Sequence, residues 1–244
     1  MKISGNKIII TGASTGIGFA LAQKFIENKN TVITIDRNPK NQAMAREKLP
    51  DLITHTCDLT DPKALKNLVD WIKSSHSDFN MLINNAGVQF NYMLEGYDWS
   101  FDTIGQEMEV NLGVPVKLCH ALLPVLSKRP HAAIVNVESF LAFAPKKSAA
   151  VYCAAKAGLH IFSQAMRYQL HNTNVKVFEI IPPLVDTKMT SGRGKNKISP
   201  DLLAEKVINA LKKEQYEIYV GKAKLARNVM RIFPGIIKNK MKYS

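Results

Sequence analysis

Tyr152 and Lys156 stand four residues apart in an amphipathic stretch, so a helix there would point both side chains to one face. An isolated tyrosine titrates near ~10 and is a poor base at neutral pH. A neighbouring ammonium group favours the phenolate, which would let the phenol donate and recover a proton. The pair therefore indicates proton transfer, although a surface tyrosine beside a helical lysine shows the same spacing.

A second group of chemically suggestive residues is the glycine run that follows an apolar stretch near the N-terminus. Gly12 permits a tight turn, Gly16 lets the backbone approach a pyrophosphate, and Gly18 allows close packing of a helix on a strand. The N-terminus of the amphipathic helix that follows offers unpaired N–H groups and a positive dipole end to phosphates. We therefore expect a dinucleotide site in this stretch rather than a purely structural turn. Its further contact residues are expected to be Ser14, Thr15 and Ile17.

The elements that must position these residues follow from the apolar pattern. Short β-branched runs alternate with helix-length amphipathic stretches, as in βαβ units around a parallel sheet. Continuous apolar runs such as 8–10 are typical of strands that helices cover on both faces. The seven expected strands are 7–11, 31–36, 52–57, 81–84, 133–137, 175–181 and 216–220, and a long helix is expected over 102–126.

Several motifs in this order resemble those of the short-chain dehydrogenases/reductases of the compact type. The glycine spacing is GxxxGxG, the run NNAG (84–87) ends the fourth expected strand, and Ser139 precedes the YxxxK motif. The likeness runs from Lys7 to about Val220. Stretches around Tyr152 and after the sixth strand are similar to a subgroup encoded beside the machinery for D-alanylation of lipoteichoic acid.

The resemblance implies an α/β fold: a Rossmann-like, doubly wound, seven-stranded parallel sheet with helices on both faces, in a single domain. The catalytic domain would cover 1–221, and 222–244 would be a basic amphipathic extension of it. It also implies a nicotinamide-dependent oxidoreductase that moves a hydride between the cofactor and a carbonyl or secondary alcohol, with Tyr152 as general acid and base.

Two further catalytic residues are implied by the resemblance. Ser139 matches a serine that holds the substrate oxygen, and Asn111 matches an asparagine that keeps a proton-relay water beside Lys156. Without the resemblance, Ser139 would be a strand-end cap and Asn111 a surface or capping group. A non-catalytic redox sensor would bind the same cofactor, but it has no need of the intact Ser139, Tyr152 and Lys156.

The choice of cofactor depends on Asp36, at the end of the second expected strand. A carboxylate there accepts hydrogen bonds from the ribose hydroxyls and repels a 2′-phosphate, which favours NAD. Arg37 leaves NADP open, because in relatives a guanidinium at this position binds the 2′-phosphate. Pro183 stands where relatives show glycine, which stiffens the loop over the nicotinamide and removes one N–H donor. The other cofactor contacts implied are Asp58, Leu59, Asn85, Ala86, Gly87, Tyr152, Lys156, Pro182, Val185 and Thr187.

The substrate side is expected to be mostly apolar, which favours a hydrophobic carbonyl or alcohol, although aromatic residues at strand ends often serve only packing. The residues implied near the reaction centre are Gln89, Phe90, Ser139, Phe140, Phe143, Tyr152, Leu184 and Met189. The polar, glycine-containing segment 187–199 is interpreted either as a mobile substrate lid or as a plain connector.

Net charge and cysteines bear on partners and location. The chain has 244 residues and a formal net charge of +13, and no acidic residue follows Gly221. Such charge suits nucleic acid, but no recognised motif or aromatic-basic patch supports that role. The basic tail either packs on the protein itself or on a neighbouring subunit, or makes weak contact with an anionic membrane. Three widely spaced cysteines form no metal motif and fit the cytoplasm, and neither a signal peptide nor a spanning helix is expected.

Relatives pair through the helices that carry Asn111 and Tyr152, which implies a homodimer or homotetramer.

Overall fold

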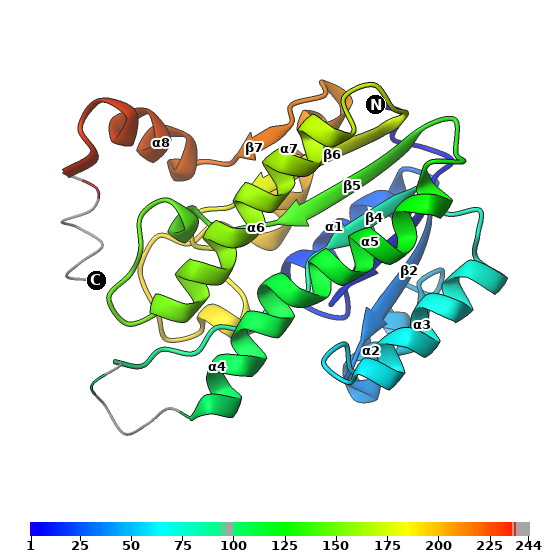
Figure 1. Ribbon diagram of the computed structural model, residues 1–244, viewed down its shortest axis with the longest axis horizontal. Coiled ribbons are helices and arrows are strands. Elements are labelled where there is room, and N and C mark those ends of the chain that lie inside the picture. The colour runs from blue at the N-terminus through cyan, green and yellow to red at the C-terminus, as the bar shows by residue number, and fades with distance from the viewer. Residues whose placement is uncertain (94, 96–99, 236, 238–244) are drawn as a thin grey trace.

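The computed structural model describes residues 1–93, 95, 100–235 and 237. Its seven strands form one parallel sheet in the order β3-β2-β1-β4-β5-β6-β7, which confirms the predicted fold class (Figure 1). The order reverses between β1 and β4, and in such sheets ligands bind at the carboxyl ends of the strands beside this reversal. The strands are β1 (Lys7–Thr11), β2 (Thr31–Asp36), β3 (Ile53–Thr56), β4 (Met81–Asn84), β5 (Ala132–Val137), β6 (Val175–Ile181) and β7 (Glu217–Tyr219).

All seven strands were predicted at these places, and four have the predicted bounds. β3 and β7 are each one residue shorter at both ends, and β5 begins one residue earlier. These differences lie at strand ends, where pairing with a neighbour decides the boundary and local propensity does not.

Helices cover both faces of the sheet. They are α1 (Gly16–Glu27), α2 (Pro39–Lys48), α3 (Pro62–Ser75), α4 (Phe101–Met108), α5 (Val114–Leu126), α6 (Ala150–Gln169), α7 (Pro200–Lys212) and α8 (Lys222–Ile232). Two short 3₁₀ helices, η2 (Phe140–Ala142) and η3 (Lys188–Thr190), lie in loops, and a π-helical turn, η1 (Glu109–Gly113), joins α4 to α5.

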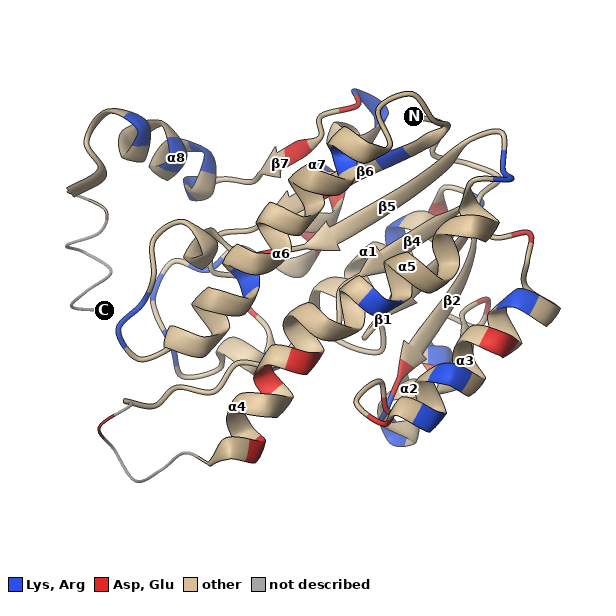
Figure 2. Cartoon of the chain, in the orientation of Figure 1, with Lys and Arg blue, Asp and Glu red and all other residues tan. Residues whose placement is uncertain are grey.

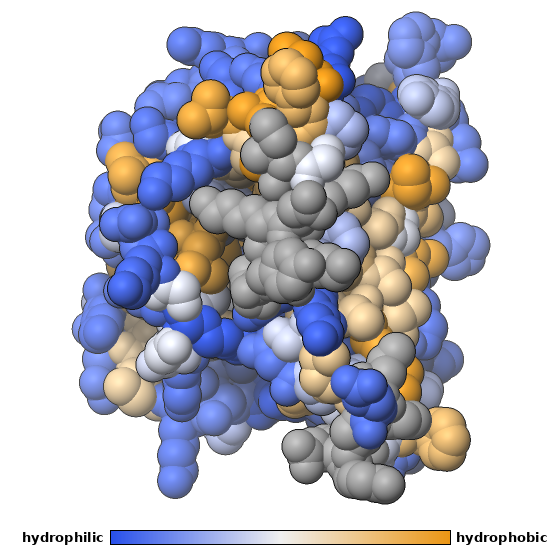
Figure 3. All heavy atoms as spheres, turned by 90° about the vertical axis from the view of Figure 1, so that its left-hand side faces the viewer, coloured by the Kyte–Doolittle hydropathy of each residue, from blue (hydrophilic) through white to orange (hydrophobic). Residues whose placement is uncertain are grey.

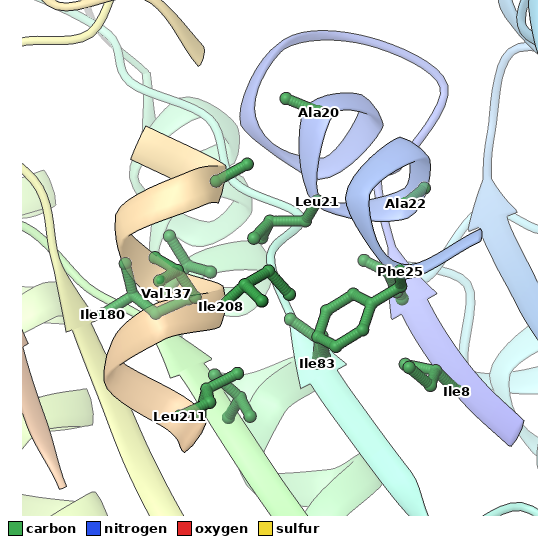
Figure 4. Packing of buried hydrophobic residues seen from close by; sticks show 14 of the residues in the cluster. Ile8, Ala20, Leu21, Ala22, Phe25, Ile83, Val137, Ile180, Ile208 and Leu211 are labelled. Carbon is green, nitrogen blue, oxygen red and sulfur yellow. The ribbon is translucent and has the colours of Figure 1, made fainter. Parts of the chain in front are cut away.

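Two apolar cores result, one on each face of the sheet. On one face α1 and α7 pack together over the central strands, and Figure 4 shows Leu21 and Phe25 of α1 beside Ile208 and Leu211 of α7. On the other face of the sheet, α3, α5 and α6 pack against the same strands and bury residues such as Leu68. Full burial of a large apolar side chain contributes about 1.5–3 kcal/mol to the free energy of unfolding. Because each core buries many such side chains, the two cores together fix the strands and the loops at their ends.

The long helix predicted over 102–126 is interrupted by the π-helical turn η1, which contains Asn111. A regular α-helix would pair the Asn111 carbonyl with the N–H of residue 115, but Pro115 has no N–H and its ring crowds that carbonyl. The wider turn removes this conflict. The prediction of a continuous α-helix is therefore wrong at this point.

The helical run Phe101–Leu126 has the length and apolar composition of a membrane span, a test that core helices also pass. Within it, Leu118, Leu122 and Leu126 are fully buried in the second core. The run is accordingly a core element of this fold.

Candidate active site

The loop between β1 and α1 carries the three predicted glycines. Gly12 has a φ of +68°, and a Cβ there would lie 3.0 Å from the Cα of Ala86. A Cβ on Gly18 would lie 2.4 Å from Asn85 Nδ2 and 2.5 Å from the Gly12 carbonyl oxygen. The geometry thus confirms a tight turn at Gly12 and close helix packing at Gly18.

Two features of this loop fit a phosphate-bearing cofactor. Thr15 is the N-cap of α1 and makes no side-chain capping bond, so the first N–H groups of the helix stay available. The Ser14 hydroxyl is buried and has no hydrogen-bond partner among the described residues. Leaving such a group unpaired costs about 1–3 kcal/mol, which a phosphate oxygen would offset. The residues present therefore fit a dinucleotide.

The NNAG motif ties β4 to this loop. The Thr11 hydroxyl accepts hydrogen bonds from the backbone N–H groups of Asn85 and Ala86, both at 3.0 Å. The Asn85 side chain donates to the carbonyls of Thr11 and Gly12 at 2.9 Å. Asn85 and Ala86 therefore brace the loop between β1 and α1 from the end of β4.

The residues predicted to select the cofactor lie together at the ends of β2 and β3. Asp36 is half-buried, and its carboxylate accepts a hydrogen bond from the Asn38 N–H at 3.1 Å. Asp58 accepts from the N–H and the hydroxyl of Thr60, at 2.9 and 2.7 Å. These bonds, and the weaker effect of the Arg37 charge, hold the pKa of Asp58 below its usual range. Leu59 is buried beside them.

The segment after β6 returns to the loop between β1 and α1, which we call the cofactor loop. A Cβ on Gly16 would lie 3.3 Å from Thr187 Cγ2, so Thr187 lies against the start of α1. The Thr187 N–H donates to the Thr190 hydroxyl, which donates in turn to the Val185 carbonyl.

The segment 187–199 contains some regular structure, and its role as a substrate lid or a plain connector stays a prediction. It contains η3, and a β-bridge joins Val185 to Ile198. Pro182 is buried, whereas Leu184 and Met189 are exposed.

Tyr152 lies on α6, 8% exposed, next to Ser139 at the end of β5. Burial raises the pKa of Tyr152 to about 12, and a hydrogen bond with the Ser139 side chain opposes this rise. The sequence argument predicted that Lys156 would favour the phenolate. The Lys156 ammonium lies 5.9 Å from the centroid of the Tyr152 ring, and desolvation of the phenol is the largest of the effects that shift the Tyr152 pKa.

Lys156 is buried on the same helix and donates a 2.7 Å hydrogen bond to the Val137 carbonyl. Burial lowers the pKa of Lys156 to about 8, and the charge of Glu138 opposes this shift. A Cβ on Gly87 would lie 2.9 Å from Asn111 Oδ1 and 4.0 Å from Lys156 Nζ. Gly87 therefore leaves open the space between these two predicted catalytic side chains.

Asn111 is fully buried, which excludes the alternative of a surface polar group. Its amide donates to the carbonyls of Val88 and Glu107, at 2.7 and 2.8 Å, and its oxygen accepts from the Val88 N–H at 3.3 Å. The side chain thus fixes the segment after NNAG to the π-helical turn.

Sequence reasoning missed Glu138, which is buried directly before Ser139. One of its oxygens accepts from the Ser163 hydroxyl at 3.0 Å, and the other has no partner among the described residues. Burial, and then the Glu179 charge, raise the pKa of Glu138 to about 9. An acidic residue between an apolar strand and Ser139 was the available signal.

His160 and Glu179 complete this buried cluster. His160 Nδ1 lies 2.5 Å from Glu179 Oε2 and 3.9 Å from Glu138 Oε2, and Arg167 forms an ion pair with Glu179. Three ligand atoms within 4.8 Å of one another have the spacing of a metal site. Because Arg167 already balances the charge of Glu179, we interpret the cluster as a hydrogen-bonded network of ionisable side chains rather than as a metal site.

Of the residues predicted near the substrate, Phe140 lies next to the Ser139–Tyr152 pair, and the others make contacts elsewhere. The structure brings Phe140 to the Ser139–Tyr152 pair, since Phe140 opens η2 directly after Ser139. The Phe143 ring packs edge-on against His160, with ring centroids 4.6 Å apart. The half-buried Phe90 donates its N–H to the buried Glu107 carboxylate at 2.8 Å, and Gln89 bonds to Asn91.

Comparison with known proteins agrees with this geometry. A family model described as short chain dehydrogenase matches residues 6–198. The oxidoreductase DltE of Bacillus subtilis, which is described as uncharacterized, is 38% identical over 224 residues, covering 89% of each chain. An uncharacterized oxidoreductase of Staphylococcus epidermidis is 29% identical, covering 86% of this chain and 92% of its own.

Solved structures show the same architecture. A short chain dehydrogenase of Burkholderia cenocepacia, in complex with NADP, has a TM-score of 0.87 and 26% identity, with 99% of both chains covered. A short chain dehydrogenase/reductase of Burkholderia phymatum, in complex with NAD, has a TM-score of 0.86 and 19% identity, with 100% of this chain and 98% of that one covered. With the glycine loop, NNAG brace and Ser139–Tyr152 pair in place, the chain belongs to the short-chain dehydrogenases, a family of nicotinamide-dependent oxidoreductases, in the subgroup of DltE.

Proposed function

We propose that this protein transfers a hydride between a nicotinamide cofactor and a carbonyl or secondary alcohol, with Tyr152 as the proton-transfer residue. The observation that carries this proposal is the buried Tyr152–Ser139 pair at the end of β5. Lys156 is held at the same strand end through the Val137 carbonyl.

In the reducing direction, Tyr152 donates its proton to the carbonyl oxygen, and Ser139 donates a hydrogen bond that stabilises the charge developing there. The bound cofactor supplies the hydride, or accepts it in the reverse direction. The Lys156 ammonium stabilises the phenolate that remains after proton transfer. Asn111 lies across Gly87 from Lys156, where a water that returns the proton to Tyr152 would be held.

NAD is the cofactor that Asp36 favours, because its carboxylate lies at the end of β2 and would repel a 2′-phosphate. The exposed Arg37 beside it keeps NADP possible. The two Burkholderia relatives support a nicotinamide cofactor of either kind, since one was solved with NADP and the other with NAD.

The partners proposed are an apolar carbonyl or alcohol and further copies of this chain. Phe140 beside Tyr152, and Met189 on the segment that returns to the cofactor loop, support an apolar substrate. Ile161 and Tyr168 are large, exposed side chains on α6, which supports pairing of copies through this helix. All three cysteines are free and buried, which is consistent with a cytoplasmic location.

The function is tested by following NADH and NADPH absorbance against a panel of aldehydes, ketones and quinones. Replacing Tyr152 with Phe removes the proton donor and preserves the ring, so turnover should fall by about 10²–10⁴-fold while cofactor affinity changes little. Full turnover in Tyr152→Phe would refute the mechanism. If the protein binds NADH tightly but reduces no member of the panel, the alternative of a redox sensor gains support.

A further inference from the structure

We infer that α8 docks the protein on an anionic lipid surface, with its apolar side entering the headgroup region and its basic side chains binding acidic headgroups. This contact is independent of hydride transfer. The inference rests on how α8 is fixed to the protein, on which of its sides is left exposed, and on its charge.

The rotation of α8 about its own axis is fixed by contacts with β7. Arg227 pairs with Glu217 at 2.9 Å, and its guanidinium lies 4.4 Å over the Tyr219 ring. Ala223, one turn earlier, is the buried residue of the helix. These contacts hold one side of α8 against the protein.

The side turned away from these contacts is apolar. Leu225 and Ile232 are 66% and 69% exposed, and Phe233, directly after the helix, is 59% exposed. With Val229 they occupy positions i, i+4, i+7 and i+8, which form one stripe along a helix. Figure 1 shows α8 projecting from the end of the molecule beyond β7, and hydrophobic and hydrophilic side chains lie together at the top of the face in Figure 3. Elsewhere in the fold, side chains of this size are mostly buried in the two cores.

The positive charge of α8 favours an anionic lipid surface as the partner of this helix. Lys222, Lys224 and Arg231 are exposed on α8, and Figure 2 shows basic and no acidic positions along the helix. Three further lysines follow at 238, 240 and 242, outside the described residues. A two-fold contact between copies through this side would bring the same basic residues of both chains together, without acidic partners in the segment. Acidic lipid headgroups complement the charge, and an apolar stripe beside basic residues is the composition of helices that lie in the lipid interface.

Flotation of the full chain with vesicles of phosphatidylcholine alone, or mixed with phosphatidylglycerol, tests the inference. We expect binding to the mixed vesicles that high salt weakens, and little binding to phosphatidylcholine. Leu225→Glu/Ile232→Glu should reduce the binding by about tenfold or more, because it places charge in the apolar stripe. Lys224→Gln/Arg231→Gln should weaken binding to the anionic vesicles specifically.

The matched control is Leu202→Glu on α7, which also replaces an exposed leucine and should leave vesicle binding unchanged. Thermal melts of each variant establish that it is folded. The inference is overturned if the wild-type chain fails to float with anionic vesicles at low salt, or if the double glutamate variant floats equally well. It is also overturned if the wild type fails to float while the glutamate variant lowers the mass of the assembly in light scattering, because a second copy would then cover this side.

Discussion

At the residue scale, the main finding is that two groups of the proposed acid-base system are buried, and burial moves their pKa values apart. It raises the pKa of Tyr152 to about 12 and lowers that of Lys156 to about 8. Desolvation disfavours the charged form in both cases, which is the phenolate for tyrosine and the ammonium for lysine. Charges placed around Lys156 therefore control how far into the alkaline range the ammonium persists.

Glu138 is the charge identified as acting on Lys156, and its removal should change the pH dependence of catalysis. In Glu138→Gln the effect that raises the pKa of Lys156 is lost, so Lys156 should give up its proton at lower pH. Activity that needs the ammonium is present below this pKa and lost above it. We therefore expect the alkaline limb of the kcat/KM profile to move down by about one pH unit.

The control for this experiment is Glu47→Gln, which removes an exposed carboxylate on α2. It should leave the profile where it is. An unshifted alkaline limb in Glu138→Gln, in a variant with normal thermal stability, would show that Glu138 does not influence Lys156.

Asp36 gives a second prediction at this scale. Asp36→Ala removes a carboxylate that would face the 2′-phosphate of NADP, and like-charge repulsion of roughly 1–2 kcal/mol corresponds to about 5- to 30-fold in relative affinity. The ratio of NADPH to NADH affinity, measured by fluorescence titration, should rise accordingly. The exposed Asp51, in the loop before β3, provides the control substitution Asp51→Ala. An unchanged ratio in Asp36→Ala would contradict the assignment.

At the scale of elements, the site depends on irregular backbone that ties helices to strands. The π-helical turn η1 places Asn111 against the segment after NNAG, and the Thr187 turn brings the loop after β6 to the start of α1. Each of these irregular segments lies beside the proposed site. They position Asn111 and Thr187, respectively, where a regular helix or strand would place the side chains differently.

The glycine loop gives a prediction with an internal control. Gly18→Ala would place a Cβ 2.8 Å or less from three neighbouring atoms, among them the Gly12 carbonyl oxygen. We expect a loss of about 1–3 kcal/mol in the free energy of unfolding, together with weaker cofactor binding, because the helix must move away from the strand. Gly105→Ala on α4 meets no atom within 4 Å and should stabilise the protein by about 0.5–1 kcal/mol. Chemical denaturation of both variants measures the difference, and equal effects would contradict the packing argument.

At the scale of the whole molecule, charge and exposed apolar surface are unevenly distributed. Seven basic residues and no acidic ones follow Gly221, and this stretch accounts for seven of the thirteen net charges. Large apolar side chains are exposed on α6 and α8, which lie on different parts of the surface (Figure 1). These two surfaces are proposed to serve different contacts, one with further copies of the chain and one with lipid.

The amino-acid sequence by itself determined the order of strands and helices, the glycine loop and the pairing of Tyr152 with Lys156. These features are local, since each depends on residues within one or two turns or one strand, and periodicity and spacing record them directly. The predicted helix was wrong at Pro115 although the proline itself was a signal in the sequence, because the apolar pattern resumes on its other side.

Only the tertiary structure decided which buried groups surround the proposed catalytic residues. Glu138 directly follows β5, whereas His160 lies on α6 and Glu179 on β6, and no spacing along the chain relates them. The tertiary structure also decided that burial dominates the pKa of Tyr152, and that the apolar side of α8 faces outward. Burial and charge proximity depend on contacts between distant segments, so they exist only once the sheet and its helices have packed.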